Sequence, residues 1–187
     1  LIVQSDRTVL LEVDNPRFEA ARDCLARFAE LEKSPEHVHT YRITPLSIWN
    51  AAAGLTADEI LQSLTSFSKY PLPAALVTEI KEYASRYGRL VLRPADPAAT
   101  GSENPGRIYL ESSDPYLIEE IWRNDRIRRH LTGRTAQGYL ELLPLERGRI
   151  KQGLIKLGFP VVDRVGYVPG APLPIRLRDC TRAGKPF

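Results

Sequence analysis

The chain contains 187 residues, which is enough for one large domain or for two small ones that each bury a core. Its hydrophobic fraction of 43% and charged fraction of 26% are ordinary for a globular protein, and no apolar run approaches the ~20 residues that span a bilayer. The two cysteines, Cys24 and Cys180, offer no metal framework and fit a reducing compartment. The chain lacks methionine, so we expect it to be part of a longer protein.

The net charge of +3 conceals an uneven distribution of charge along the chain. Residues 1–120 hold 12 basic and 18 acidic side chains, a balance of −6, whereas residues 121–187 hold 14 and 5, a balance of +9. An asymmetry of this size indicates that the C-terminal third meets a polyanion. The alternative is a solvated surface that happens to be basic.

The first elements are predicted to be two short strands, a helix and another strand. The apolar segments LIVQ and VLLEV flank the turn SDRT, which is typical of a hairpin. In the helix that follows, an apolar stripe at helical spacing runs from Phe18 to Leu31. The alternation in HVHTYRIT then predicts a strand that directs Tyr41 and Ile43 toward the core.

Three helices and a hairpin come next. The first helix ends at Gly54, Thr56 and Glu59 form a capping box for the second, and the third ends at Gly88. RLVLRP and RIYLES then read as two strands joined by a loop rich in Pro, Gly and Asn. Because strand, three helices and hairpin is the order of a winged helix, we predict one at residues 40–111.

The last third is predicted to hold further helices at residues 114–131 and then a small βαββ unit. This unit consists of the strand GYLELL, the helix LERGRIKQGLIKLG and two extended pieces, FPVVDRV and PIRLRD. On its helix Arg147, Lys151 and Lys156 recur at spacings of four and five. We expect these three cations to reach one DNA backbone, with Arg149 to one side.

The pair His37 and His39 is the first candidate for chemistry. Two residues apart in a strand, they would point the same way and could chelate a metal. A zinc site, however, needs about four ligands, or three and a water, and Glu36 is the only carboxylate beside them. We therefore expect structural roles at the strand entry, no metal site, and only a minor case for a metal-dependent enzyme.

Other catalytic patterns are absent from the sequence. It contains no GxxxxGK[ST] phosphate loop and no GxSxG nucleophile motif. The adjacent Glu119 and Glu120 would splay ~100° apart on a helix, so a solvated face explains them better than paired acid–base catalysis. We predict no catalytic residue and no cofactor within these 187 residues.

Nucleic-acid binding is the better supported class. A winged helix places its third helix in the major groove, but here two acidic residues balance Lys81 and Arg86, so we assign that helix to protein contact. The segments IWRNDRIRRH and ERGRIKQGLIK concentrate cations, and Trp122 can either stack on a base or pack in the core. The candidate DNA-binding residues are Arg123, Arg126, Arg128, Arg129, Arg147, Arg149, Lys151 and Lys156.

Several segments resemble, in order, parts of one family. HVHTYRITPLSIWNAA, GLTADEILQSLTSFSK, PLP and YGRLVL resemble the region ahead of the motor in XPB-type DNA repair helicases, and RIYLESSDPYLIEEIWRNDRI continues the similarity. ERGRIKQGLIKLGFPVVDRVGYVPGAPLPIRLRD resembles the small damage-recognition domain before the first helicase lobe. The short junction GRTAQG (133–138) resembles the compact prokaryotic form, since the long eukaryotic form carries an extended acidic linker there.

The resemblance implies a parent protein that is an ATP-dependent 3′-to-5′ DNA helicase or translocase acting in nucleotide excision repair. ATP and Mg²⁺ would bind to two RecA-like lobes, whose motifs this chain does not contain. The implied partners are DNA, the helicase lobes of the same polypeptide, and a nuclease or other repair protein, with no membrane. The implied location is the cytoplasm, in association with the prokaryotic nucleoid.

The predicted fold is therefore α+β in two domains. Residues 1–132 would form an N-terminal domain with the winged helix, for contact with a partner or with the motor. Residues 137–187 would form a small damage-recognition-like domain for DNA binding. The alternative function is a stand-alone winged-helix adaptor that binds protein and whose basic tail is incidental.

Overall fold

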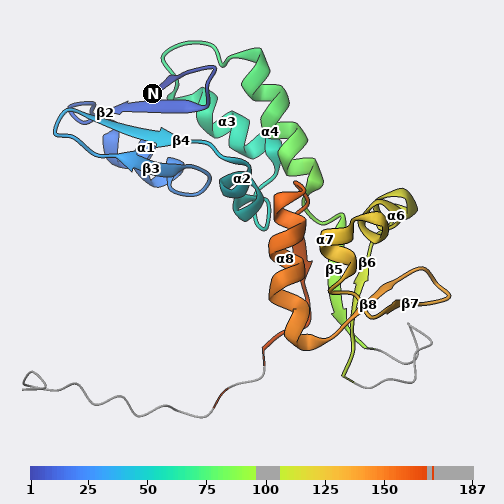
Figure 1. The fold of residues 1–187 in the computed structure, drawn as a ribbon. Coiled ribbons are helices and arrows are strands. Elements are labelled where there is room, and N and C mark those ends of the chain that lie inside the picture. Colours follow the sequence, from blue (N-terminus) through green and yellow to red (C-terminus); the bar gives the residue numbers. More distant parts are fainter. Residues whose placement is uncertain (96–105, 168–169, 171–187) are drawn as a thin grey trace, which may run out of the picture.

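The computed structural model describes residues 1–95, 106–167 and 170. Within them the protein has two sheets, each with its own hydrophobic core (Figure 1). This is an α+β fold, as the sequence predicted. In that part of the chain, no helix is both long and apolar enough to cross a membrane.

The first unit is a four-stranded antiparallel sheet followed by three helices. Its strand order is β1-β2-β4-β3. The elements are β1 (Ile2–Val3), β2 (Thr8–Glu12), α1 (Phe18–Leu25), β3 (Glu30–Lys33), β4 (Val38–Arg42), α2 (Pro45–Ala51), α3 (Ala57–Phe67) and α4 (Ala74–Arg86). The strand predicted from HVHTYRIT is confirmed, and Tyr41 and Ile43 are buried as expected.

The predicted extent of the first helix is wrong. The helix was expected to carry its apolar stripe to Leu31, but α1 ends at Leu25. Leu31 lies instead in the edge strand β3, where it pairs with Tyr41 of β4. The strand gains backbone hydrogen bonds to β4, and a continued helix would have left that sheet edge unpaired.

Capping explains where two of the helices begin. The Thr56 hydroxyl accepts a hydrogen bond from the Glu59 backbone N–H, and the Glu59 carboxylate accepts one from the Thr56 backbone N–H, which confirms the predicted capping box of α3. Thr44 and Ser47 form the same reciprocal pair at α2. Each pair satisfies two of the backbone groups that a helix end would otherwise leave open.

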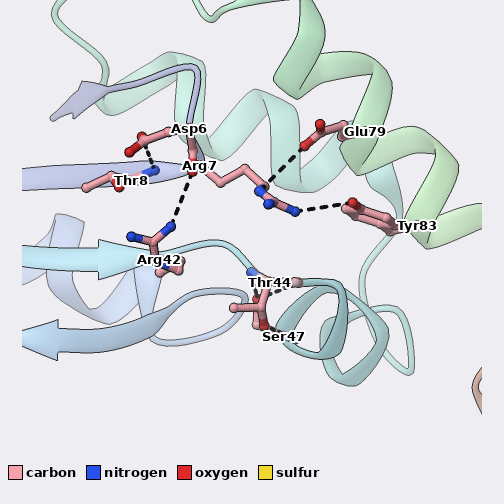
Figure 2. Close-up of polar contacts among 8 residues, drawn as sticks. All are labelled: Asp6, Arg7, Thr8, Arg42, Thr44, Ser47, Glu79 and Tyr83. Carbon is pink, nitrogen blue, oxygen red and sulfur yellow. Dashed lines mark hydrogen bonds and ion pairs between the residues drawn. The ribbon is translucent and has the colours of Figure 1, made fainter. Parts of the chain in front are cut away.

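Arg7 ties the turn between β1 and β2 to α4 (Figure 2). Its backbone has φ 74°, a left-handed conformation, and its Nη1 donates to the Tyr83 hydroxyl at 3.3 Å. Its Nε lies 3.8 Å from the Glu79 carboxylate. These contacts bring the sheet and the last helix together over a core that includes Val9, Ile48, Ile60, Leu64, Leu76 and Ile80.

The second unit is a five-stranded sheet whose order is β7-β8-β6-β5-β9. The strands β5 and β9 pair in parallel, and the other neighbours pair antiparallel. The elements are β5 (Leu90–Pro94), β6 (Ile108–Glu111), α6 (Pro115–Arg123), α7 (Asp125–Arg128), β7 (Gly133–Arg134), β8 (Leu140–Leu142), the 3₁₀ turn η1 (Pro144–Glu146), α8 (Arg147–Lys156) and β9 (Val161–Asp163). Alternate strand residues and all three helices share one core, which includes Leu92, Leu110, Ile118, Ile127, Leu140 and Leu154.

The cores divide at the junction between α4 and β5, not at residue 132. The hairpin β5–β6 was predicted as the wing of a winged helix at 40–111, but its apolar residues belong to the second core and its strands pair with β8 and β9. The predicted independent domain at 137–187 likewise contributes β8, α8 and β9 to that shared sheet. The predicted piece PIRLRD lies outside the described residues. A hairpin of β5 and β6 alone would leave one edge of each strand without backbone partners. In the five-stranded sheet β9 pairs with the free edge of β5 and β8 with that of β6, which explains the arrangement.

The two units meet where α4 approaches the end of α8 (Figure 1). The Arg86 guanidinium donates to the Gly158 carbonyl at 3.4 Å and lies 5.7 Å from the centre of the Phe159 ring. Arg89 lies over the same ring at 5.8 Å. This junction fixes α8 beside the first unit.

Candidate nucleic-acid interface

The helix α8 sorts its polar residues onto two different faces. Ile150 and Leu154 are fully buried in the second core. On one side of this apolar stripe, Arg147 and Lys151 turn toward β9. On the other side, a second set of polar residues turns toward α7, namely Arg149, Gln152 and Lys156.

Asp163 at the end of β9 holds the first pair of cations. Arg147 makes a bidentate contact with its carboxylate, with both distances 2.6 Å, and Lys151 lies 2.9 Å away. The exposed fractions of these side chains are 15% for Arg147, 31% for Lys151 and 11% for Asp163. Two of the eight predicted DNA-binding cations are therefore committed to an internal ion pair.

The environment of Asp163 favours its charged form. Burial by itself raises the pKa of this carboxyl, but hydrogen bonds from Arg147 and Lys151, and one from the Val165 backbone N–H, outweigh it. The net result is a pKa below the ordinary value of 3.8. Asp163 is thus ionised at neutral pH and neutralises cations that would otherwise face solvent.

The second set of cations converges on a pocket between α7 and α8 with a volume of about 460 Å³. Its apolar lining consists of the buried Ile127 and the exposed Leu157, and Gly153 brings the two helices close together. A Cβ at Gly153 would lie 3.3 Å from the Ile127 side chain. The cations that line the pocket are Arg126, Arg129, Arg149 and Lys156, all of them exposed.

Hydrogen bonds orient part of this pocket wall. The Arg129 Nε donates to the Arg126 carbonyl at 3.1 Å, and the Arg149 Nη1 donates to Glu146 at 3.1 Å. The other oxygen of Glu146 lies 2.6 Å from Nδ1 of His130, which also lines the pocket. Both arginines keep free guanidinium N–H groups for a ligand.

Within the described residues, Arg126, Arg129 and Lys156 form no ion pair. The pocket therefore presents three uncompensated charges, and a fourth on Arg149, whose partner Glu146 is shared with His130. Clefts lined by one sign of charge focus the field and raise the local concentration of counter-ions. This arrangement suits an anionic ligand.

The remaining predicted cations lie outside the pocket. Arg123 pairs with Glu119 at 3.0 Å on α6 and is 77% exposed. Arg128 lies over the Trp122 ring, with 3.5 Å between the guanidinium carbon and the ring centre. Trp122 also packs against the second core, so the alternative of a core residue describes it better than a base-stacking platform.

His37 and His39, at the start of β4, make structural contacts. His39 stands edge-on to Phe18, with 5.1 Å between ring centres, and the His37 carbonyl accepts a hydrogen bond from Val13. Among the described residues, no group of three or more His, Cys, Asp or Glu side chains is placed to hold a metal ion.

The cations of α4 are paired with carboxylates. Lys81 lies 3.7 Å from Asp58, and Arg86 pairs with Glu82 one turn away. This agrees with the nearly neutral helix read from the sequence.

Comparison with known proteins places the chain in a family. The sequence pattern of the family described as "Helicase conserved C-terminal domain" matches residues 1–136, which is more than half of the chain. The chain belongs to this family.

Individual relatives of this helicase-domain chain are helicases by name. It is 46% identical over its whole length to "DNA 3'-5' helicase XPB" of Kineococcus radiotolerans, and 48% identical over 96% of its length to the protein of that name in Mycobacterium tuberculosis. It is 25% identical over 89% of its length to a "General transcription and DNA repair factor IIH helicase/translocase subunit XPB" of Enterocytozoon bieneusi. The chain spans 32%, 31% and 26% of these relatives, respectively.

The resemblance to the XPB family drawn from sequence motifs is thereby confirmed, and the chain is a helicase-associated region. Nothing in the comparisons supports the alternative of a stand-alone adaptor. Its position ahead of the motor and the damage-recognition role stay predictions.

Sequence reasoning missed several residues of the α7–α8 pocket. Gln152 and Gly153 lie on the same face as Arg149 and Lys156, and the seven-residue spacing of those two cations was the available signal. The pairing of His130 with Glu146 depends on how the turn after β8 meets α7, which no local pattern encodes.

Proposed function

We propose that this chain is the DNA-binding and motor-docking region of an ATP-dependent 3′-to-5′ DNA helicase or translocase that acts in DNA repair. The observation that carries the DNA-binding part is the convergence of Arg126, Arg129, Arg149 and Lys156 on one pocket. The homology to proteins named DNA 3′-5′ helicase supports DNA as the polyanion.

The docking part of the proposal concerns the first unit. The cations of its last helix, α4, are paired with carboxylates of α3 and of α4 itself, so this helix is poorly suited to phosphate contacts. We assign α2 to α4 to contact with helicase lobes of the same polypeptide, which would bind ATP and Mg²⁺. Because the relative from Enterocytozoon bieneusi carries the name of a transcription and repair factor subunit, we also propose a repair protein, such as a nuclease, as partner. The proposed location is on the prokaryotic nucleoid.

The geometry changes the set of residues assigned to DNA. Arg147 and Lys151 are committed to Asp163, so we place them outside the contact surface. Arg126, Arg129, Arg149 and Lys156 form the proposed contact set. If each cation meets one phosphate, the slope of log K against log salt is about −3 to −4 on duplex, or about −3 on a single strand.

The test is DNA binding by fluorescence anisotropy across a salt series, with an internally labelled oligonucleotide that lacks terminal phosphates. Arg149→Glu and Lys156→Glu should each weaken binding and reduce the slope by about 1. Lys81→Glu, the matched reversal on α4, should change neither the affinity nor the slope. An effect of Lys81→Glu that exceeds the other two would move the DNA surface to α4 and reverse the roles of the two units.

A further inference from the structure

We infer that the α7–α8 pocket receives the terminal phosphate of a DNA strand, a phosphate monoester, in preference to a phosphodiester within the backbone. This inference rests on the proposed DNA-binding function and specifies the ligand of the same site.

Charge is the first reason. Arg126, Arg129, Arg149 and Lys156 face one pocket, and in the described part of the chain only Arg149 among them pairs with a carboxylate. A backbone phosphodiester carries one negative charge. A phosphate monoester carries about −1.5 to −2 at pH 7 and has three strong acceptor oxygens. The monoester therefore matches four converging cations better.

Donor geometry is the second reason. The Arg129 guanidinium is held through its Nε and the Arg149 guanidinium through one Nη, so each still offers N–H groups in a plane. Guanidinium groups bind phosphate oxygens in pairs, and these charge-assisted bonds are about twice as strong as neutral ones. Two such groups from opposite helices need a ligand with several free oxygens, which a strand end provides.

The size of the pocket is the third reason. Its volume of about 460 Å³ lies within the range of ~300–1,000 Å³ that is typical of sites for small molecules. The polar side chains of Gln152 and His130 on its wall can face the sugar of a terminal nucleotide. The pocket thus has room for the last nucleotide of a strand as well as its phosphate.

The Glu146–His130 pair has a positioning role in this site. One Glu146 oxygen holds Arg149 at 3.1 Å and the other holds Nδ1 of His130 at 2.6 Å. This fixes the side of the pocket formed by η1 and α8 against the side formed by α7. The cations are consequently arranged before a ligand arrives, which lowers the entropic cost of binding.

The experiment compares three oligonucleotides of one sequence that carry a 5′-phosphate, a 3′-phosphate, or hydroxyls at both ends. Affinities for the unmodified protein are measured by competition at constant ionic strength. We expect one of the phosphorylated forms to bind about tenfold more tightly than the hydroxyl form, and the 5′ and 3′ arms identify the end. Arg126→Ala and Lys156→Ala should reduce this ratio to about 1, whereas Arg123→Ala, outside the pocket, should preserve it.

The results separate this inference from the proposed function. If the three oligonucleotides bind equally, and Arg126→Ala weakens the binding of all three alike, the pocket binds phosphodiesters within the DNA backbone. The inference then fails, while the proposed DNA-binding function stands. If none of them binds, the proposed function fails too. A phosphoserine peptide that competes while neither phosphorylated oligonucleotide is preferred would also overturn the inference. Circular dichroism of each variant checks that these exposed substitutions leave the fold intact.

Discussion

Asp163 decides which cations of α8 are available to a ligand. It is one carboxylate, yet it engages both Arg147 and Lys151 and ties α8 to the edge strand β9. A helical wheel drawn from the sequence displays Arg147 and Lys151 as exposed cations. The carboxylate that neutralises them comes from the next strand, and its approach depends on how that strand pairs.

Asp163→Asn should destabilise the protein by about 1–3 kcal/mol at pH 7, because two partly buried cations would lose their charged acceptor. The folded-state pKa of Asp163 lies below its ordinary value of 3.8, so its stabilisation is complete above that pH and is lost as the pH falls through the lowered folded pKa. The difference between the two proteins should therefore be constant from pH 5 to 8 and should shrink below about pH 4.

Urea unfolding at pH 7 and pH 3 measures this difference. Asp125→Asn is the control, because Asp125 is exposed and forms no ion pair with any described residue. An equal loss of stability in the two variants would mean that the ion pairs with Asp163 contribute nothing.

At the scale of the element, the spacing of residues along α8 determines which of its cations share a face. Residues five apart on a helix differ by about 140° in direction, whereas residues seven apart differ by about 20°. The predicted grouping of Lys156 with Lys151 was therefore wrong, and the structure places Lys156 with Arg149. This correction could have been made from the sequence alone.

The start of α3 was predictable for a local reason, and β3 was not. A capping box needs only two residues three apart, Thr56 and Glu59, so its signal lies entirely in the sequence. The strand β3 has the sequence ELEK, which gives no apolar alternation, and its single apolar residue extends the stripe of the preceding helix. Pairing with β4 overrides that local pattern.

Gly158 ends α8 in a backbone conformation that suits glycine, so substitutions there test the junction between the two units. Its φ is 87°, and a Cβ would lie 2.7 Å from the Arg86 guanidinium. We expect Gly158→Ala to destabilise the protein by about 1–2 kcal/mol through the left-handed backbone alone.

Gly148→Ala is the matched control for this change. Gly148 lies inside the same helix, and outside the adjacent helix backbone no atom lies within 4 Å of the position of its Cβ. The substitution should therefore stabilise the protein by up to about 1 kcal/mol. Thermal unfolding of both variants gives the comparison. A Gly158→Ala protein as stable as the parent would show that this helix end tolerates an ordinary residue.

At the scale of the whole molecule, the sequence predicted most elements and misplaced the boundary between units. The hairpin β5–β6 was assigned to the helices that precede it, because strand, helices and hairpin follow one another in the order of a winged helix. The hairpin instead lies at the centre of the second sheet, between β8 and β9. The parallel pairing of β5 with β9 joins residues about 70 positions apart, and local patterns carry no information about such pairing.

The division of the cores predicts how fragments behave. Residues 1–88 contain all the buried residues of the first core, from Val3 to Ile80, together with the contact between Arg7 and Tyr83. We expect this fragment to fold alone and to unfold cooperatively. Residues 137–187 contain β8, α8 and β9, but β6 and β5 lie between the two strands. Without them, both strands lose their partners and the apolar face of α8 loses its cover, so this fragment should not fold.

Two-dimensional NMR spectra of the two fragments show by their amide chemical-shift dispersion whether each fragment is folded. Residues 89–187 are the matched control. The control adds the missing β5 and β6 and the helices α6 and α7, and so restores the second core, from Leu90 to Leu154. It should give dispersed signals where 137–187 does not. Dispersed signals from 137–187 by itself would restore the small independent domain predicted from the sequence. The basic pocket requires Ile127 of α7 against Gly153 of α8, so only the longer fragment can carry the proposed DNA site.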